Sequence, residues 1–580
     1  MRQFLQEIKR RNVAKVGIVY LIAGWLTMQV VDIMFPALKL PEWMITAVAA
    51  LIIIGLPFAL IFAWAFEMTP EGLKLEKHVD RSQSITPQTG QKLNRVAILI
   101  LIGAVGLLLV DKFFLQNRVE QPAPVATRPS IAVLPFVNMS DDQANEYFSD
   151  GLSEELLNLL AKIPQLHVAG RTSSFKFKGT NEDLRVIGEQ LNVDNVLEGS
   201  VRKSGPRLRI TAQLIDTENG YHLWSETYDR DLTDIFQIQD EIAKNVVGAL
   251  RVHLLGEQVT LTTKGTTLTE AYNLFLQGNY FLAHSSAENL QKSIDAYERA
   301  IELDPNFARA YAGLSFAVGQ QVGGWTGGGG GFVEGYERVR GYAEKAYELA
   351  PDSPDALLAM SNALLNADWD FAANTRHIER AISIEPTNSI LLEAHGFNLL
   401  VLGRFEEAEA LLKKATEIDP LSVSAYRALG DVQLAARHFE DAIETYETAL
   451  RLSPESARLH ERIARAYLFK NDVDAAAEHA VQEPVAWVRE LVEIMILHRR
   501  GDRDAWSRAV QEYEASYGNA NAYQLAEIYA DSGDLDATFE WLKVTADVRD
   551  PGGVWGLVMP YFDDARKDPR WPEFKSAFKL

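Results

Sequence analysis

Residues 423–456 read VSAYRALGDVQLAARHFEDAIETYETALRLSPES, and they carry the clearest fold signal in the C-terminal part of the chain. Small and apolar residues stand in it at the offsets at which two antiparallel helices pack: Leu429, Gly430, Ala442, Tyr446 and Ala449. Larger side chains at the alanine positions would push the two helices apart. The stretch therefore predicts one helical hairpin of about 34 residues.

The same arrangement recurs along the chain, because a proline ends each unit and an alanine stands five residues before it. The prolines are Pro305, Pro351, Pro386, Pro420 and Pro454, at intervals of 46, 35, 34 and 34 residues. The alanines are Ala300, Ala346, Ala381, Ala415 and Ala449. This period, with one insertion, is that of tetratricopeptide repeats (TPR). We therefore predict an all-α TPR superhelix with a C-terminal cap over residues 265–580.

Some units depart from the repeat pattern. Ser293 and Asn374 stand where an alanine is usual, and the register is lost after Pro484. Residues 523–529, followed by a glycine and a tryptophan at repeat spacing, predict one further hairpin before the cap.

The concave face of such an array is its usual binding surface, lined by the second, fifth, ninth and twelfth residues of each first helix. This offset predicts partner-binding residues in three consecutive repeats: Glu393, Phe397, Arg427, Asp431, Arg458, Glu461 and Arg465. An extended peptide of mixed charge with an apolar anchor would fit such a groove. The alternative interpretation is that these side chains belong to merely solvated helix faces.

Three apolar runs near the N-terminus, residues 16–35, 43–66 and 96–115, are each long enough to cross the ~30 Å hydrocarbon layer of a bilayer. They predict a membrane module with three transmembrane helices over residues 1–118. A cleaved signal peptide is the competing interpretation of the first run. It is disfavoured because no small-x-small site follows that run and two more apolar runs do.

Basic residues predict the orientation of this module. Five of them precede the first run: Arg2, Lys9, Arg10, Arg11 and Lys15. Five more lie between the second and third runs: Lys74, Lys77, Arg81, Lys92 and Arg95. The loop between the first two runs holds only Lys39. By the positive-inside rule we predict a multi-pass protein of the inner (cytoplasmic) membrane, with a cytoplasmic N-terminus and a periplasmic soluble region.

Residues 119–128 contain two prolines and few large apolar side chains, which predicts an extended linker. An α/β domain is predicted over residues 129–254. Residues 131–137 form a nearly continuous apolar run, as in a buried strand, and residues 207–215 alternate between apolar and polar side chains. Asn219-Gly220 then predicts the turn of a β-hairpin.

Two local patterns lie between these strands. Residues 174–178 alternate between polar and aromatic side chains. Thr180 with Asp183 forms a capping-box signal for a helix that presents Leu184 and Leu191.

Five short motifs lie in this domain: residues 128–136 (RPSIAVLPF), 148–152 (FSDGL), 171–175 (RTSSF), 197–201 (LEGSV) and 223–228 (LWSETY). Together they resemble the TolB N-terminal-like (FlgO-like) domain of bacterial envelope proteins. Residues 9–13 (KRRNV) and 66–73 (FEMTPEGL) are similar to the N-terminal module joined to this domain in many membrane-anchored proteobacterial TPR proteins. The resemblance implies a multidomain chain: an all-α transmembrane segment, an α/β domain and an all-α TPR superhelix. Relatives of this kind are often labelled adenylate cyclases.

Composition excludes some classes of function. The chain has no cysteine, which rules out disulfides, thiolate metal sites and thiol nucleophiles. Its net charge is −22, with +5 over residues 1–118 and therefore −27 over the remainder. A field of that sign repels phosphate groups, so we expect no nucleic acid as a partner of the soluble part.

Several patterns that could indicate chemistry do not complete a known site. The glycine run 327–331 lacks the Lys-Ser/Thr of a P-loop, and His460-Glu461 lacks the second histidine of a zinc helix because Ala464 stands in its place. A nucleotide cyclase needs paired acidic residues for metal ions, whereas Asp141-Asp142 lie in a loop without a nearby basic residue. Asp32, in the first apolar run, could mark an ion path but lies near its exit end. We therefore expect no catalysis, no cofactor and no metal.

The sequence thus favours a membrane-anchored periplasmic scaffold whose TPR groove and α/β domain bind protein or peptide partners, with a homo-oligomer left open. The alternatives are a transmembrane signalling or regulatory sensor, a nucleotide cyclase and a regulator of transcription. Residues 67–95 contain no recognisable output domain, which favours the scaffold over the sensor. Residues 1–15 are too short for a DNA-binding domain, which disfavours the transcriptional regulator.

Overall fold

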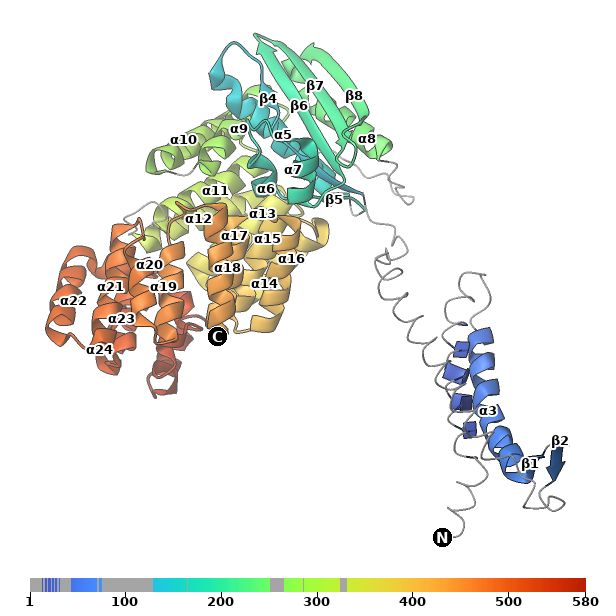
Figure 1. Ribbon diagram of the computed structural model, residues 1–580. Helices are drawn as coiled ribbons and strands as arrows, with labels where there is room; N and C mark the ends of the chain where they lie inside the picture. Colours follow the sequence, from blue (N-terminus) through green and yellow to red (C-terminus); the bar gives the residue numbers. More distant parts are fainter. Residues whose placement is uncertain are drawn as a thin grey trace. The chain divides into compact units, whose positions relative to one another are not determined.

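The computed structural model describes residues 43–69, 72–75, 129–163, 165–250, 265–284, 286–323 and 331–579, together with scattered positions between residues 13 and 31. The chain divides into two compact units, Met1–Ala126 and Thr127–Leu580, which are described separately (Figure 1). The apolar run 96–115, the predicted linker 119–128 and Asp32 lie outside the described residues.

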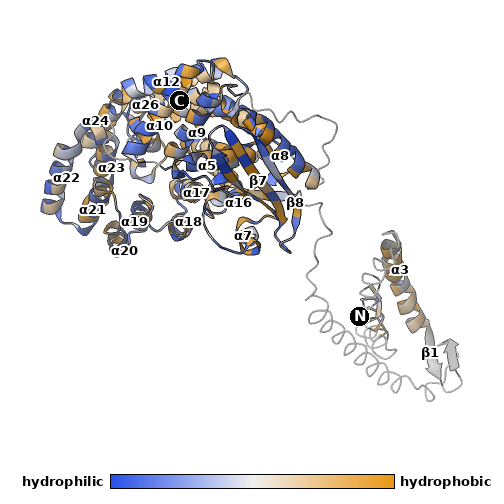
Figure 2. Cartoon of the chain, turned by 90° about the horizontal axis from the view of Figure 1, so that it is seen from above, coloured by the Kyte–Doolittle hydropathy of each residue, from blue (hydrophilic) through white to orange (hydrophobic). Residues whose placement is uncertain are grey.

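The first unit contains, among its described residues, one helix long and apolar enough to cross a membrane, Ala47–Ala65. It forms most of α3 (Trp43–Ala65), which is coloured as mainly hydrophobic in Figure 2. Described positions of the preceding apolar run contact this helix. The Tyr20 hydroxyl donates a hydrogen bond to the Ile52 carbonyl (3.1 Å), and a Cβ on Gly24 would collide with Ile52. An antiparallel hairpin follows α3, formed by β1 (Phe66–Thr69) and β2 (Gly72–Leu75).

The second unit begins with a mixed sheet. Its strands are β3 (Ser130–Val133), β4 (Val137–Asn138), β5 (His167–Val168), β6 (Asn195–Ser204), β7 (Arg207–Asp216) and β8 (His222–Asp231). The order is β5-β3-β6-β7-β8, and β4 also pairs with β6. β3 runs parallel to β5 and β6, whereas β7 runs antiparallel to β6 and β8. The predicted hairpin between β7 and β8 is confirmed. Its Gly220 has a φ of 74°, in the left-handed region that glycine adopts without strain.

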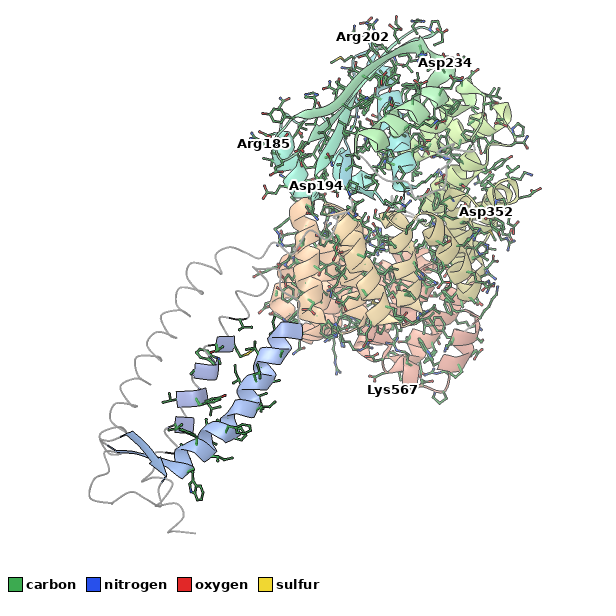
Figure 3. All side chains as sticks on the ribbon, turned by 90° about the vertical axis from the view of Figure 1, so that its right-hand side faces the viewer. Arg185, Asp194, Arg202, Asp234, Asp352 and Lys567 are labelled. Atoms are coloured by element: carbon green, nitrogen blue, oxygen red, sulfur yellow. The ribbon has the colours of Figure 1, made fainter. Side chains whose placement is uncertain are left out.

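Helices cover the sheet unequally. They are η4 (Gln143–Asn145), α5 (Glu146–Ala161), α6 (Arg171–Phe175), α7 (Leu184–Leu191), η5 (Leu232–Asp234) and α8 (Ile235–Ala249). The apolar faces of α5 and α8 form one core with the inward side chains of β6 and β7. On the other face α7 covers Val196 with Ile187 and Leu191. Beyond this cluster the outward side chains of β6 and β7 are polar, and Arg202 of β6, labelled in Figure 3, is one of them.

The remaining helices pair consecutively into hairpins, as the repeat period predicts. They are α9 (Thr269–Ala283), α10 (Ala287–Leu303), α11 (Ala308–Val322), α12 (Phe332–Leu349), α13 (Pro354–Ala363), η6 (Leu364–Asp368), α14 (Phe371–Ile384), α15 (Ser389–Val401), α16 (Phe405–Ile418), α17 (Val423–Ala435), α18 (Phe439–Leu452), α19 (Leu459–Phe469), α20 (Val473–Ala480), α21 (Ala486–Arg500), α22 (Arg503–Tyr517), η7 (Gly518–Asn521), α23 (Ala522–Ser532) and α24 (Leu535–Asp547). A tail follows, with α25 (Gly553–Gly556), η8 (Pro560–Phe562), η9 (Ala565–Lys567) and α26 (Trp571–Ser576).

Close approach of paired helices explains the small residues of the repeat. A Cβ on Gly430 of α17 would lie 2.4 Å from a ring carbon of Tyr446 on α18. That ring cannot move aside easily, because Tyr446 is fully buried and its hydroxyl donates to the Asp431 carboxylate (2.8 Å).

We expect Gly430→Ala to lower the free energy of unfolding by about 1–3 kcal/mol through overpacking. Gly341→Ala is the matched control, since Gly341 also lies inside a helix but a Cβ there meets nothing within 4 Å. Its higher helix propensity should stabilise the chain by about 0.5–1 kcal/mol. Urea unfolding of both variants measures the effects, and a loss of stability of equal size in both would contradict this packing argument.

The α/β domain packs on the edge of the array that carries the turns before the first helices. Glu155 of α5 accepts two hydrogen bonds from Arg309 of α11, each 2.7 Å long. Ser173 of α6 donates its backbone amide to Asp419 at 2.7 Å, and its hydroxyl donates to the same carboxylate. Lys176 donates to the Leu452 carbonyl at 2.9 Å. These contacts join the domain to repeats far apart in the sequence.

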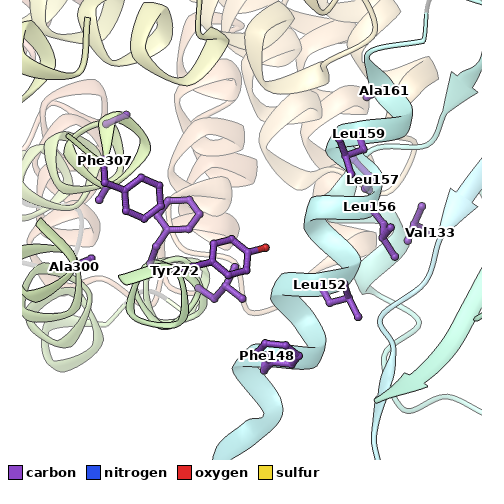
Figure 4. Packing of buried hydrophobic residues seen from close by; sticks show 14 of the residues in the cluster. Val133, Phe148, Leu152, Leu156, Leu157, Leu159, Ala161, Tyr272, Ala300 and Phe307 are labelled. Atoms are coloured by element: carbon purple, nitrogen blue, oxygen red, sulfur yellow. The ribbon is translucent and has the colours of Figure 1, made fainter. Parts of the chain in front are cut away.

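Apolar packing supports the same junction. α5 lies between the sheet and the first repeats, with Val133 on one side and Tyr272 and Phe307 on the other (Figure 4). A Cβ on Gly151 of α5 would collide with Leu276 of α9. The α/β domain and the first repeats therefore share one core.

Candidate partner-binding groove

The seven predicted groove residues come from the first helices of three consecutive repeats, α15, α17 and α19. Four of them keep some exposure to solvent: Glu393, Phe397, Arg427 and Arg458. The other three are buried: Asp431, Glu461 and Arg465. The structure therefore leaves the first four side chains partly accessible to solvent and buries the other three.

The buried charges are held by partners within the array. The Asp431 carboxylate accepts hydrogen bonds from the Tyr446 hydroxyl (2.8 Å) and from Nε of Arg462 (2.6 Å). Burial would lower the pKa of Arg462, but Asp431 and Glu461 raise it above its ordinary value. Asp431 therefore fixes the positions of two neighbouring helices, α18 and α19, which is a structural role.

Arg465 links α19 to the last repeat. Its guanidinium donates to both oxygens of Glu527 on α23, at 2.7 and 2.9 Å, and also pairs with Glu461. Burial alone would raise the pKa of Glu461, but Arg465 and Arg462 hold it below its ordinary value. Repeat spacing did not indicate Glu527, because it lies 62 residues from Arg465 in the chain.

The accessible residues form a small patch of mixed charge. Burial, with repulsion from Arg462, lowers the pKa of Arg427 to about 10. The Arg458 guanidinium lies 5.4 Å from the ring centroid of Trp487, and its backbone amide donates to Glu483 (3.1 Å). Such a patch can bind a partner segment through charge-assisted hydrogen bonds and stacking on the exposed part of the Trp487 ring.

Glu393 in this patch makes the stability of the folded array depend on pH. Burial raises its pKa to about 7. An unfolded chain releases this proton near pH 4.3, so between about pH 4.3 and 7 the folded state holds a proton that the unfolded state has lost. The contribution of Glu393 to stability is thus complete below that range, and it is lost as the pH rises through about 7.

We therefore expect Glu393→Gln to remove part of the fall in stability that the chain shows between pH 4.5 and 7, by up to about 1.4 kcal/mol per pH unit. Gln preserves the hydrogen bond to the Ser422 hydroxyl, which lies 3.4 Å from the carboxylate. Urea midpoints of the two proteins at several pH values measure the difference. Parallel curves would show that Glu393 titrates normally in the folded chain.

The tail of the chain, residues 549–579, lies against the inner face of the repeats. We call it the C-terminal segment. Trp555 packs edge-on against Phe397, with ring centroids 4.9 Å apart. The Arg465 guanidinium lies over the ring of Tyr561, 5.5 Å from the centroid of that ring. Two of the predicted groove residues therefore already contact a segment of the same chain.

Further contacts hold the C-terminal segment to residues that the sequence did not single out. Trp369 stacks on Phe578 with ring centroids 4.3 Å apart, and Phe469 packs against Tyr561 at 4.4 Å. Arg437 forms an ion pair with Asp563, and Arg549 donates to the Ala367 carbonyl. The repeat period places side chains on helices but carries no information on the path of the tail. Its richness in aromatic residues is the one available signal.

Two other patterns tested in the sequence have structural partners. Asp142 accepts a hydrogen bond from the Ala144 amide (2.9 Å) and caps η4. Nδ1 of His460 lies 3.1 Å from Nδ1 of His479, on the neighbouring helix α20. Within the part of the chain that the structure describes, no group of three or more metal-ligating side chains is close enough to hold an ion.

Comparison with known families identifies the repeats. Residues 282–307, 394–437 and 427–483 match tetratricopeptide-repeat models. Residues 127–245 match the second domain of HilA/YgeH-like transcriptional regulators. The chain therefore contains TPR repeats, which are protein-interaction modules, beside an α/β domain similar to one found in those regulators.

Similar proteins cover parts of the chain. It is 38% identical over 247 residues to "Putative adenylate cyclase 3" of Rhizobium meliloti, which is 42% of each protein. It is 22% identical over 352 residues to the transcriptional regulator HilA of Salmonella typhimurium, which is 59% of each. The chain thus spans less than two thirds of the length of these curated relatives.

Some solved structures are similar to parts of this chain. Pseudomonas aeruginosa PilF is 21% identical with a TM-score of 0.29, over 36% of this chain and 92% of that one. A tetratricopeptide repeat protein of Parabacteroides merdae is 12% identical with a TM-score of 0.34, over 48% of this chain and 99% of that one.

Proposed function

We propose that this protein is a membrane-anchored periplasmic scaffold that binds protein or peptide partners through its TPR groove and its α/β domain, without catalysis. The observation that carries the proposal is the set of partly exposed side chains Glu393, Phe397, Arg427 and Arg458, which come from the first helices of three consecutive repeats in the region that matches TPR models. Charged and aromatic side chains in a row are the means by which such a surface binds an extended segment. Self-association into a homo-oligomer is compatible with the same surface.

Exposed apolar side chains support the membrane anchor. Leu51, Ile53 and Phe58 on α3 are 69%, 71% and 69% exposed. A soluble helix seldom leaves a band of this kind in water, whereas a bilayer would cover it. We propose that residues 16–35, 43–66 and 96–115 each cross the inner membrane, because each run is long enough to span it. Basic residues precede the first and the third run, which favours a cytoplasmic position for both of those ends.

The proposed domain boundaries follow the same pattern. We propose a membrane module over residues 1–118, a linker over 119–128, a TolB N-terminal-like (FlgO-like) α/β domain over 129–254 and a TPR array with a cap over 265–580. A reporter fused after Lys579 tests the orientation: alkaline phosphatase, active only in the periplasm, should be active there. Activity of a cytoplasmic reporter at that position would reverse the assignment.

Crosslinking in living cells tests the groove. A photoreactive amino acid at Arg427 or Arg458 should capture a discrete partner protein. The same residue at Glu444, which is exposed on the second helix α18, should capture nothing specific. Equal capture from the two helix faces would reject the groove as the binding surface.

A second candidate, a transmembrane signalling or regulatory sensor, is favoured by the match of residues 127–245 to a domain of transcriptional regulators. In this case binding outside the membrane would alter the packing of the spans. Deleting residues 76–94 would then abolish the downstream response but leave partner capture at Arg427 intact. A scaffold would keep both.

The name of the Rhizobium meliloti relative raises nucleotide cyclase activity as a third candidate. The purified full chain, with ATP and Mg²⁺ or Mn²⁺, should form no cyclic AMP. Asp142 already accepts a hydrogen bond from Ala144 as a helix cap. Turnover abolished by Asp141→Asn with Asp142→Asn would overturn the non-enzymatic assignment.

A further inference from the structure

The C-terminal segment occupies part of the surface that a partner would use. Phe397 and Arg465 are groove positions by their place on the first helices, and both contact aromatic rings of the segment, Trp555 and Tyr561. The segment crosses several repeats, because its contacts run from Trp369 after α13 to Phe469 at the end of α19. It therefore lies along four consecutive repeats and contacts two of the predicted groove positions, Phe397 and Arg465.

The contacts divide into two kinds. Phe562 and Phe578 are fully buried, and Phe562 packs against Tyr523 of the last repeat, so this part of the segment acts as a cap on the array. By contrast, the ion pair of Arg437 with Asp563 leaves the two side chains 40% and 43% exposed. The groove side of the segment, Trp555 and Asp563, keeps some exposure and is thus held more loosely than the buried rings of Tyr561, Phe562 and Phe578.

We propose that the C-terminal segment is an internal ligand of the groove, and that the partner is a segment of the same chemistry, with aromatic side chains and an acidic residue, which competes with it. This inference rests on the proposed function and adds regulation to it. The partner would place aromatic rings against Phe397 and Phe469 and a carboxylate against Arg437. Binding would require the groove side of the segment to be released.

A labelled synthetic peptide of residues 549–579 tests the competition on the full chain in detergent micelles. The double variant Trp555→Ala with Asp563→Ala removes the ring contact with Phe397, the ion pair with Arg437 and the ion pair of Asp563 with Arg566 inside the segment, and it changes no residue of the repeats. It should bind the peptide about tenfold more tightly than the natural chain does. Lys575→Ala, an exposed position on α26, is the matched control and should bind as the natural chain does.

The groove side provides the complementary variant. Phe397→Ala with Arg437→Ala, introduced into the loosened chain, should return peptide binding to the level of the natural protein. The proposal would be overturned if the loosened chain bound the peptide no more tightly than the natural chain. It would also be overturned if Phe397→Ala with Arg437→Ala did not weaken binding of the peptide.

A second measurement does not depend on weakened packing. Because the chain has no cysteine, Arg437→Cys with Asp563→Cys allows a cleavable bis-maleimide to lock the segment in place. The locked protein should lose binding of the peptide, and cleavage of the linker should restore it. Peptide binding that persists in the locked protein refutes the internal ligand. Failure to capture a partner at Arg427 in cells would instead count against the proposed function alone.

Discussion

Replacing Arg309 by methionine is expected to lower the free energy of unfolding by about 3–5 kcal/mol, because it leaves a buried carboxylate without its counter-charge. The Glu155 side chain is 1% exposed and receives both of its hydrogen bonds from Arg309. Arg309 also pairs with Asp355 (2.9 Å) and lies 4.7 Å from the Phe275 ring centroid. Burial alone would lower the pKa of Arg309, but Glu155 and Asp355 raise it well above its ordinary value.

This pair joins α5 of the α/β domain to the repeats, so the loss should appear as separation of the two parts. Hydrogen exchange of the backbone amides of α5 and α11 should become faster in the variant. The double variant Arg309→Met with Glu155→Met should recover most of the stability, since an apolar pair can replace a buried ion pair. Equal losses in the single and double variants would show that packing, and not the unpaired charge, causes the effect.

Arg465→Met is the second change with a large expected effect, again about 3–5 kcal/mol. It removes the ion-pair partner of Glu527, whose side chain is 1% exposed, and one of the two arginines that pair with Glu461, whose side chain is 3% exposed. It also removes the contact with Tyr561 of the C-terminal segment. Urea unfolding of the full chain, followed by tryptophan fluorescence, measures the loss.

The matched control is Arg380→Ala. Arg380 also forms an ion pair, with Asp352 at 2.9 Å, but the two side chains are 59% and 76% exposed. Water screens such a pair, so we expect a change within about 0.5 kcal/mol. If Arg465→Met lowered the free energy of unfolding as little as this control does, water would have to reach the charged cluster around Glu527.

The repeats could be predicted closely because their signal is local. Ala449 and Gly430 are small where two helices of one hairpin meet, and the structure confirms both as buried contacts. The spacing of these residues depends only on helix geometry and on the length of the turn. The hairpin predicted around residues 523–541 is present as α23 and α24.

Within the α/β domain, local signals were less reliable. The capping-box prediction placed the N-cap of the helix at the wrong residue. Asp183 caps α7, because its carboxylate accepts a hydrogen bond from the Arg185 amide. The Thr180 hydroxyl instead donates to the Phe177 carbonyl. The alternation of residues 174–178 is typical of a strand, yet residues 171–175 form α6. Contacts of Ser173 with Asp419, 246 residues away, fix that turn, and no local pattern contains them.

The candidate site shows the same division. Helix periodicity placed Phe397, Arg427 and Arg465 on one side of the array, but it did not show that Arg465 is neutralised by Glu527 or that Trp555 covers Phe397. Those pairings depend on how many repeats separate two helices around the superhelix. A small rotation at each hairpin adds up over the array and decides which distant side chains meet.

Elements whose energies are local follow from the residues alone: an apolar helix of spanning length, strands with alternating burial, and hairpins with small residues at their contacts. The path of the whole chain, by contrast, joins the α/β domain to the array through Glu155 and Ser173 and brings Trp555 of the C-terminal segment against Phe397. The reason is physical. Local structure is set by neighbours along the chain, whereas burial of a charge or an aromatic ring depends on the path of the whole array.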